Sequence, residues 1–169
     1  MESMLIALAV ALVIALALAF LTRGDGFPYR LQPGLFTPAE RSFLGVLQQA
    51  VGEEYAIFGK VRVADVVKVE SMSNRSRWAR AFNRISGKHV DFVLCDKDTM
   101  EIVAAIELND RSHNSPSRKA RDEFLEKVFA AAGLPFIQIP AKRSYVTSGI
   151  RVTIKRAIEP TPKPEGGLA

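Results

Sequence analysis

The sequence predicts an α/β domain, with a mixed sheet flanked by helices, joined to one N-terminal transmembrane helix. An uncharged apolar run of eighteen residues, Met4–Leu21, has nearly the length of a membrane-spanning helix. After it, segments with helical apolar spacing alternate with short apolar runs rich in strand-forming residues, which is the order of elements in an α/β domain.

Length and charge set the first bounds. The chain has 169 residues, which suits one domain with an appendage. Its net charge is +5, and Glu2 is the only charged residue among the first 22. The rest is therefore mildly basic, which favours an anionic partner such as nucleic acid or a membrane surface. The single cysteine, Cys95, excludes an internal disulfide, and we expect it to be a small buried residue of a strand.

We predict that residues 1–22 are a retained membrane anchor. At about 1.5 Å of rise per residue, the apolar run crosses most of a hydrocarbon core of roughly 30 Å, and it has no polar face. A cleaved signal peptide is the alternative, although no positive charge precedes the run and the run is long for such a peptide. Arg23 and Arg30 follow the run, so the positive-inside tendency predicts a single-pass protein with a cytoplasmic C-terminal domain.

Residues 23–36 are rich in glycine and proline and are expected to form a linker. A helix is predicted to begin after Thr37, with Thr37 as the N-cap, Pro38 at the first helical position and Glu40 as the capping-box carboxylate. Apolar residues at helical spacing follow, and Gly52 is expected to end the helix.

A strand is predicted over Tyr55–Val63, and a basic helix or ordered loop follows over Ser71–Ser86. The basic segment contains Arg75, Arg77, Arg80 and Arg84. These arginines either contact the phosphates of a nucleic acid or form a solvated face that Trp78 and Phe82 anchor to the core.

Two apolar runs that each carry an acid are predicted to form a β-hairpin. Asp91 lies within the run His89–Cys95, and Glu107 lies near the end of the run Ile102–Leu108. A short polar turn joins the two runs. Two acids on neighbouring strands predict a site for a divalent metal ion and a phosphate.

The remaining segments complete the predicted domain, residues 37–158. Residues 117–132 have helical apolar spacing, and Gly133 is expected to end that helix. A strand over residues 134–139 follows, and the strand–helix–strand order predicts that it pairs in parallel with the preceding strand. Residues 144–157 form a terminal helix or an irregular piece, and residues 159–169 are expected to be a disordered tail.

Several stretches together resemble a bacterial family of unknown function, domain of unknown function 2726. They are Lys88–Asp96, Ala105–His113, Ala120–Asp122 and Ala132–Phe136. That family is similar to the restriction-endonuclease-like PD-(D/E)xK superfamily, near the very-short-patch-repair type of nuclease. The resemblance implies a restriction-endonuclease-like fold and Mg²⁺-dependent hydrolysis of phosphodiesters in DNA or RNA. The predicted anchor, which lies outside the resemblance, would hold this domain at the inner membrane.

The resemblance also implies roles for residues. Asp91 and Glu107 match the metal-binding acids, and the carbonyl of Leu108 is a candidate third ligand. The implied catalytic set is Asp91, Glu107, Asn109, His113 and Glu40. The candidate nucleic-acid-binding residues are Arg75, Arg77, Arg80, Arg84, Lys119 and Arg121. Asp122 and Gln138 match further polar positions. Mg²⁺ prefers oxygen ligands and would neutralise charge on the scissile phosphate and lower the pKa of an attacking water.

Asn109 departs from this pattern, because the superfamily usually has lysine there and the family usually has aspartate. A neutral amide neither neutralises a phosphate nor binds a metal strongly. Two alternatives therefore stay open: a catalytically inactive module that binds nucleic acid or anionic lipid, and a structural membrane protein that binds a partner. The candidates also have ordinary interpretations, with Glu40 only capping its helix, Asp91 paired with an arginine such as Arg80 or Arg84, and Glu107 facing solvent.

Overall fold

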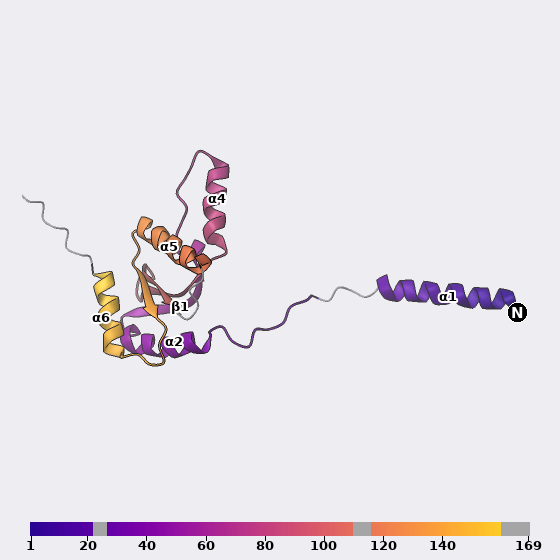
Figure 1. Cartoon of the computed structure of the whole chain (residues 1–169), viewed down its shortest axis with the longest axis horizontal. Helices are drawn as coiled ribbons and strands as arrows, with labels where there is room; N and C mark the ends of the chain where they lie inside the picture. Colours follow the sequence, from indigo (N-terminus) through magenta and orange to yellow (C-terminus); the bar gives the residue numbers. More distant parts are fainter. Residues whose placement is uncertain (22–26, 110–115, 160–169) are drawn as a thin grey trace, which may run out of the picture. The chain divides into compact units, whose positions relative to one another are not determined.

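The structure is a computed structural model of the whole chain, and it describes residues 1–21, 27–109 and 116–159. The chain divides into two compact units, Met1–Pro33 and Gly34–Ala169 (Figure 1). The first unit contains helix α1, and the second contains all the other helices and strands of the described residues.

Helix α1 spans Glu2–Leu21 and confirms the predicted N-terminal helix. Large apolar side chains are exposed along it, from Met4 to Phe20. By length and composition, the helix is able to cross a membrane.

The second unit is a four-stranded sheet with helices on both faces. Its strands are β1 (Tyr55–Arg62), β2 (His89–Asp96), β3 (Ile102–Asn109) and β4 (Phe136–Pro140). Its helices are α2 (Pro38–Val51), α3 (Val63–Val66), α4 (Arg75–Ser86), α5 (Pro116–Ala131) and α6 (Thr147–Ile158). The strands lie in chain order, antiparallel except for the parallel pair β3–β4. The predicted α/β class, hairpin and parallel pairing are therefore confirmed.

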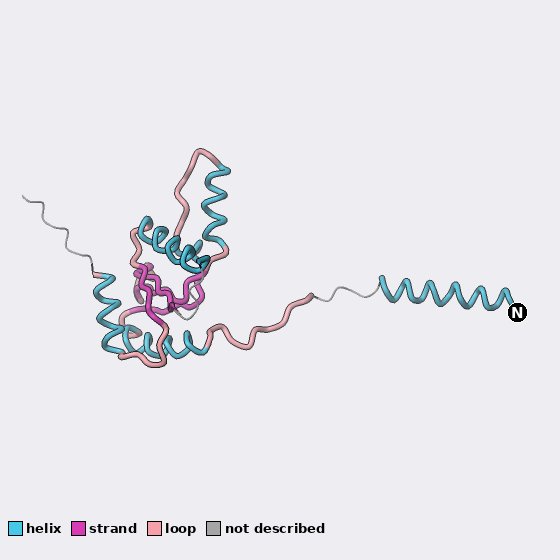
Figure 2. The backbone as a smooth tube through the Cα atoms, in the orientation of Figure 1, coloured by secondary structure: helices cyan, strands magenta, loops and turns pink. Residues whose placement is uncertain are grey.

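Each face of the sheet carries its own apolar core. On one face, α2 and α6 pack against β2, β3 and β4 around Phe43, Phe92 and Ile154. On the other face, α3, α4 and α5 pack around Val93, Leu125 and Phe129. Figure 2 shows the sheet between these two groups of helices.

Local signals in the sequence set the limits of these elements. Thr37 caps α2 in a capping box, as predicted: its hydroxyl oxygen accepts the backbone N–H of Glu40, and the Glu40 carboxylate accepts the backbone N–H of Thr37. Asp96 closes the β2–β3 turn because its carboxylate accepts the N–H groups of Asp98 and Thr99. Gly133, at the end of the α5 region, has a φ of +68°, a conformation that glycine adopts without a steric penalty.

The sheet forks between β2 and β3. Their pairing ends at Phe92 and Ile106, although both strands continue. Beyond that point β2 stays paired with β1 as far as His89, and β3 stays paired with β4 as far as Asn109. Asp91 and Glu107 are the first residues beyond the last pair, so the fork holds both predicted acids.

Phe36 covers the β1 strand just before the fork. Its ring stacks on Phe92 at 5.5 Å and occupies the space above Gly59, where an added Cβ would lie 2.2 Å from Phe36 Cζ. A side chain at Gly59 would therefore displace this ring from the core.

Gly59→Ala is predicted to destabilise the second unit by about 1–3 kcal/mol, because the Phe36 ring must move. Gly45→Ala in α2 is the matched control: its new methyl group meets nothing within 4 Å, and removing a helix-interior glycine should stabilise by roughly 0.5–1 kcal/mol. Chemical denaturation of the full chain in neutral detergent, followed by circular dichroism, measures both. Equal effects of the two substitutions would contradict the close contact at Gly59.

Candidate active site

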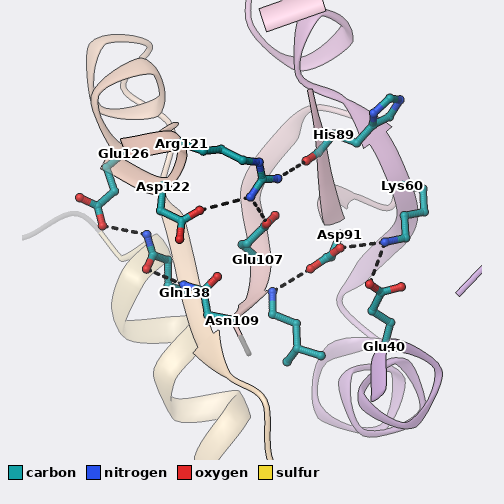
Figure 3. Close-up of polar contacts among 11 residues, drawn as sticks. Glu40, Lys60, His89, Asp91, Glu107, Asn109, Arg121, Asp122, Glu126 and Gln138 are labelled. Carbon is teal, nitrogen blue, oxygen red and sulfur yellow. Dashed lines mark hydrogen bonds and ion pairs between the residues drawn. The ribbon is translucent and has the colours of Figure 1, made fainter. Parts of the chain in front are cut away.

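The first acid, Asp91, bridges the two arms of the fork (Figure 3). Its Oδ2 accepts a hydrogen bond of 2.9 Å from the backbone N–H of Leu108 on β3, and its Oδ1 accepts one of 3.0 Å from Nζ of Lys60 on β1. A backbone donor beyond the end of a strand ladder needs another acceptor when it is shielded from water. Asp91 provides that acceptor, and its cationic partner is Lys60 instead of Arg80 or Arg84.

Lys60 is a site residue that the sequence prediction missed. Its Nζ lies 2.8 Å from Oε1 of Glu40 and 3.0 Å from Oδ1 of Asp91, so it joins helix α2 to the fork (Figure 3). The signal in the sequence was a lysine placed directly after Gly59, between the apolar residues Phe58 and Val61 of the strand.

The backbone of Lys60 is in the left-handed region, with a φ of +55°. This conformation costs a non-glycine residue of order 1–3 kcal/mol, and such strain is concentrated at functional sites. The strand changes face at this point. Gly59 lies against Phe36 of the α2-side core, whereas Val61 packs in the α5-side core.

The ion pair keeps Lys60 and Glu40 charged. Burial opposes charge on Glu40, but hydrogen bonds from Lys60 and from the N–H of Thr37 lower its pKa below the ordinary value. Burial also opposes charge on Lys60, but its bonds to Glu40 and Asp91 raise its pKa. Glu40 therefore both caps α2 and holds the lysine of the site.

The second acid, Glu107, is the one charged residue among the described residues whose side chain is buried, with 7% of its surface exposed. Its Oε1 accepts a bond of 2.8 Å from Arg121, while its Oε2 is buried and has no hydrogen-bond partner among the described residues. Burial raises the pKa of Glu107; the negative charge of Asp91 raises it further, and Arg121 opposes both effects. The interpretation of Glu107 as a solvent-facing acid is therefore wrong.

Arg121, on α5, reaches both arms of the fork. Its NH1 bonds to Glu107 on β3 and, at 3.2 Å, to Oδ1 of Asp122, while its NH2 donates to the carbonyl oxygen of His89 on β2 (Figure 3). Burial opposes its charge, but Glu107, Asp122 and Asp91 together raise the pKa of Arg121 above its ordinary value. Its predicted contact with nucleic acid stays a prediction.

A chain of side-chain hydrogen bonds fixes Asn109 on the same strand. Nε2 of Gln138 donates to Glu126 at 2.7 Å, and Nδ2 of Asn109 donates to Oε1 of Gln138 at 2.8 Å. Because the Glu126 carboxylate only accepts hydrogen bonds, it sets the orientation of both amides. Oδ1 of Asn109 takes no part in this chain of hydrogen bonds between described residues, and Asn109 shares a strand face with Glu107, two residues earlier.

Among the described residues, the other predicted cations form no ion pair with this network. The side chains exposed on α4 and α5 include Arg75, Arg77, Arg80, Arg84 and Lys119. His113 lies outside the described residues. Its role, the roles of these cations and the role of the Leu108 carbonyl all stay predictions.

The fork offers a pair of carboxylates and no larger cluster of metal ligands. In residues 1–21, 27–109 and 116–159, no group of three or more His, Cys, Asp or Glu side chains is arranged to hold a metal ion. Mg²⁺, however, is often bound through one or two protein carboxylates and keeps several waters. Oε2 of Glu107 is buried, unpaired and close to a second negative charge, which is the environment that a cation would relieve. The oxygen donors therefore fit a hard cation.

Comparison with known proteins identifies one family. A family model described as "Protein of unknown function (DUF2726)" matches residues 32–158. No curated protein and no solved structure matches the chain. The matched residues include every element from α2 to α6 and all the residues of the fork described above.

Glu107→Gln is predicted to change how stability depends on pH. The pKa of Glu107 is raised above its ordinary value of 4.5, so between pH 4.5 and the raised pKa the folded state binds more protons than the unfolded state. The stability of the wild-type chain should fall as pH rises through this window, by at most about 1.4 kcal/mol per pH unit for one group. The glutamine of the variant does not titrate, and Arg121 still has its ion pair with Asp122. The variant should therefore become more stable relative to wild type as the pH rises through this window.

Thermal unfolding in EDTA, from about pH 4 to about pH 8, measures this difference. Glu101→Gln, which alters an exposed acid near the start of β3, is the matched control and should follow the wild-type curve. Parallel curves for Glu107→Gln and wild type would show that the fork does not disfavour the Glu107 charge.

Proposed function

The chain belongs to the DUF2726 family of proteins of unknown function, and on that premise we propose that its second unit is a metal-dependent nuclease with a restriction-endonuclease-like fold. The mixed sheet with helices on both faces supports the fold. The reaction is hydrolysis of a phosphodiester bond in nucleic acid.

One observation carries the proposal: a buried, half-satisfied carboxylate lies beside a second carboxylate at a fork in the sheet. Leaving Oε2 of Glu107 without a partner costs the fold on the order of 1–3 kcal/mol. If Glu107 only formed a structural ion pair with Arg121, nothing would be gained by leaving Oε2 unpaired. In a cation site, the unpaired Oε2 would be a metal ligand. The raised pKa of Glu107 supports the same interpretation, because perturbed acids are concentrated at functional sites.

The residues of the fork would have different roles in this reaction. Asp91 and Glu107 would hold one Mg²⁺, with the carbonyl of Leu108 as a further oxygen. When bound, Mg²⁺ supplies charge neutralisation on the scissile phosphate and lowers the pKa of the attacking water. Arg121 would release Glu107 and bind the phosphate, for which its planar guanidinium is suited.

Lys60 would supply the positive charge that the neutral side chain of Asn109 lacks. Asn109 occupies the position where the resembled superfamily usually has lysine, but Lys60 brings a cation to Asp91 from β1. The amide of Asn109, oriented through Gln138, would hydrogen-bond a water or a phosphate oxygen through Oδ1. The site would then have both the charge and the hydrogen-bond acceptor, from two different strands.

We also propose that α1 anchors this unit to the inner membrane, with the nuclease-like unit in the cytoplasm. The support is the length and apolar composition of α1, together with Arg23 and Arg30 after it and Glu2 before it.

The nuclease proposal predicts that the full chain, in neutral detergent with Mg²⁺ or Mn²⁺, cleaves plasmid DNA or a structured RNA. Glu107→Gln and Asp91→Asn should each lower the rate at least about a hundredfold, because a metal ion contributes several kcal/mol to such a reaction. Lys60→Met should lower it roughly 10–100-fold, as expected for a residue that supports the metal ligands.

Glu101→Gln removes an acid outside the fork and should leave the rate unchanged. Cleavage that survives Glu107→Gln, or that continues in EDTA, would sink the assignment. Binding of nucleic acid without cleavage in the wild-type chain would favour the catalytically inactive module.

The anchor proposal predicts that deletion of residues 1–21 moves the protein from the membrane fraction to the soluble fraction. Protease added to intact spheroplasts should leave the second unit uncut. Mass spectrometry of the purified chain should find the N-terminal residues retained, and an N-terminus beyond Leu21 would identify a cleaved signal peptide instead.

A further inference from the structure

A basic cavity lies beside the fork, between the end of α4, the start of β2 and the first turns of α5. Its volume is about 270 Å³. The lining residues are Arg84, Lys88, Ser117, Ala120, Arg121 and Phe124. Half of them carry a positive charge and none is acidic.

Two of these cations have no acidic partner. No ion pair within the described residues includes Arg84 or Lys88. Glu70 lines an adjoining groove together with Arg84 but makes no ion pair with it. The cavity therefore concentrates positive charge that no ion pair of the described residues neutralises at Arg84 or Lys88.

Phe124 holds both of these cations in place. The Arg84 guanidinium lies 4.1 Å from the centre of the Phe124 ring, and Nζ of Lys88 lies 5.7 Å from it. Attraction between a cation and an aromatic face keeps each side chain over the ring, so less conformational entropy is lost when an anion binds. This arrangement suits a group that presents several oxygens at once, such as a phosphate.

The cavity continues a row of cations that leads to the two carboxylates. Arg77, Arg80 and Arg84 follow one another at intervals of three and four residues, so they share one side of α4. Arg121 lines the cavity and also contacts Glu107. A row of this kind matches the successive phosphates of a nucleic-acid strand better than it matches the plane of a membrane surface.

We propose that this cavity binds a backbone phosphate of the nucleic acid, next to the phosphate that faces Asp91 and Glu107. This inference rests on the proposed nuclease function and assigns Lys88, which sequence reasoning did not single out, as a phosphate-binding residue. Arg121 lines the cavity and pairs with Glu107, so a phosphate bound in the cavity would draw Arg121 away from Glu107.

The test measures the affinity of the full chain, in neutral detergent and EDTA, for a fluorescently labelled DNA strand of about 20 nucleotides and for the matching duplex. The double variant Arg84→Gln, Lys88→Gln keeps most of each apolar stem over Phe124. It should weaken binding at least about tenfold and reduce the slope of log affinity against log salt by about 2. The control is Arg156→Gln, Lys97→Gln, which removes the same charge from exposed positions elsewhere and should change affinity less than about twofold.

Equal losses in the two double variants would overturn the proposal, because the effect would then come from net charge alone. Loss of binding to vesicles containing phosphatidylglycerol, with nucleic-acid affinity unchanged, would overturn it in favour of a lipid headgroup. A matching unfolding midpoint for variant and wild type establishes that the loss is local. Because binding is measured without metal, a loss of affinity specific to the Arg84→Gln, Lys88→Gln variant supports phosphate binding in the cavity even if the chain cleaves no nucleic acid. If the chain cleaves nucleic acid but this variant binds with unchanged affinity, the cavity proposal fails and the nuclease proposal stands.

Discussion

The fork between β2 and β3 is the constraint on which the rest of the site depends. Strands that separate leave backbone groups without their usual partners, and those groups need hydrogen bonds from elsewhere. Here two side chains provide them. Asp91 accepts the N–H of Leu108, and Arg121 donates to the carbonyl oxygen of His89. Because both side chains are ionic, each needs a counter-ion, which explains why Lys60 and Glu107 are close to the same point.

The two acids of the fork differ in how well they are satisfied. Both oxygens of Asp91 accept hydrogen bonds, whereas Glu107 uses one oxygen and buries the other without a partner. A second cost lies close by, in the left-handed backbone of Lys60. The packed cores on the two faces of the sheet make these local costs tolerable. Two unfavourable features at one point of an otherwise well-packed domain are typical of a functional site.

The parts of the fold that depend on neighbouring residues were predictable from the sequence. The capping box at Thr37, the turn at Asp96 and the end of α5 near Gly133 each follow from residues within a few positions of one another. Asp91 stood out as an acid inside an apolar strand, and Glu107 as an acid near the end of one.

The contacts of the site were not predictable in the same way. Lys60 is 31 residues from Asp91, and it reaches that acid from a strand whose side chains change face at a left-handed residue. Arg121 was predicted as a nucleic-acid contact, and only the packing of α5 brings it to Glu107. The sequence predicts either a helix or an ordered loop over Ser71–Ser86, and most of this segment forms α4, which begins after the cap Asn74.

The charge of the ion-paired residues at the fork bears on the question that Asn109 raises. Among the described residues that these ion pairs join, there are four carboxylates, those of Glu40, Asp91, Glu107 and Asp122, and two cations, those of Lys60 and Arg121. With every group ionised, these residues carry one excess negative charge around Lys60 and one around Arg121. Burial, together with the negative charge of Asp91, raises the pKa of Glu107, the most buried of the acids. A lysine at position 109 would have neutralised the excess on the β3 arm. With a neutral amide there, one excess negative charge stays beside Glu107, where a metal ion would relieve it.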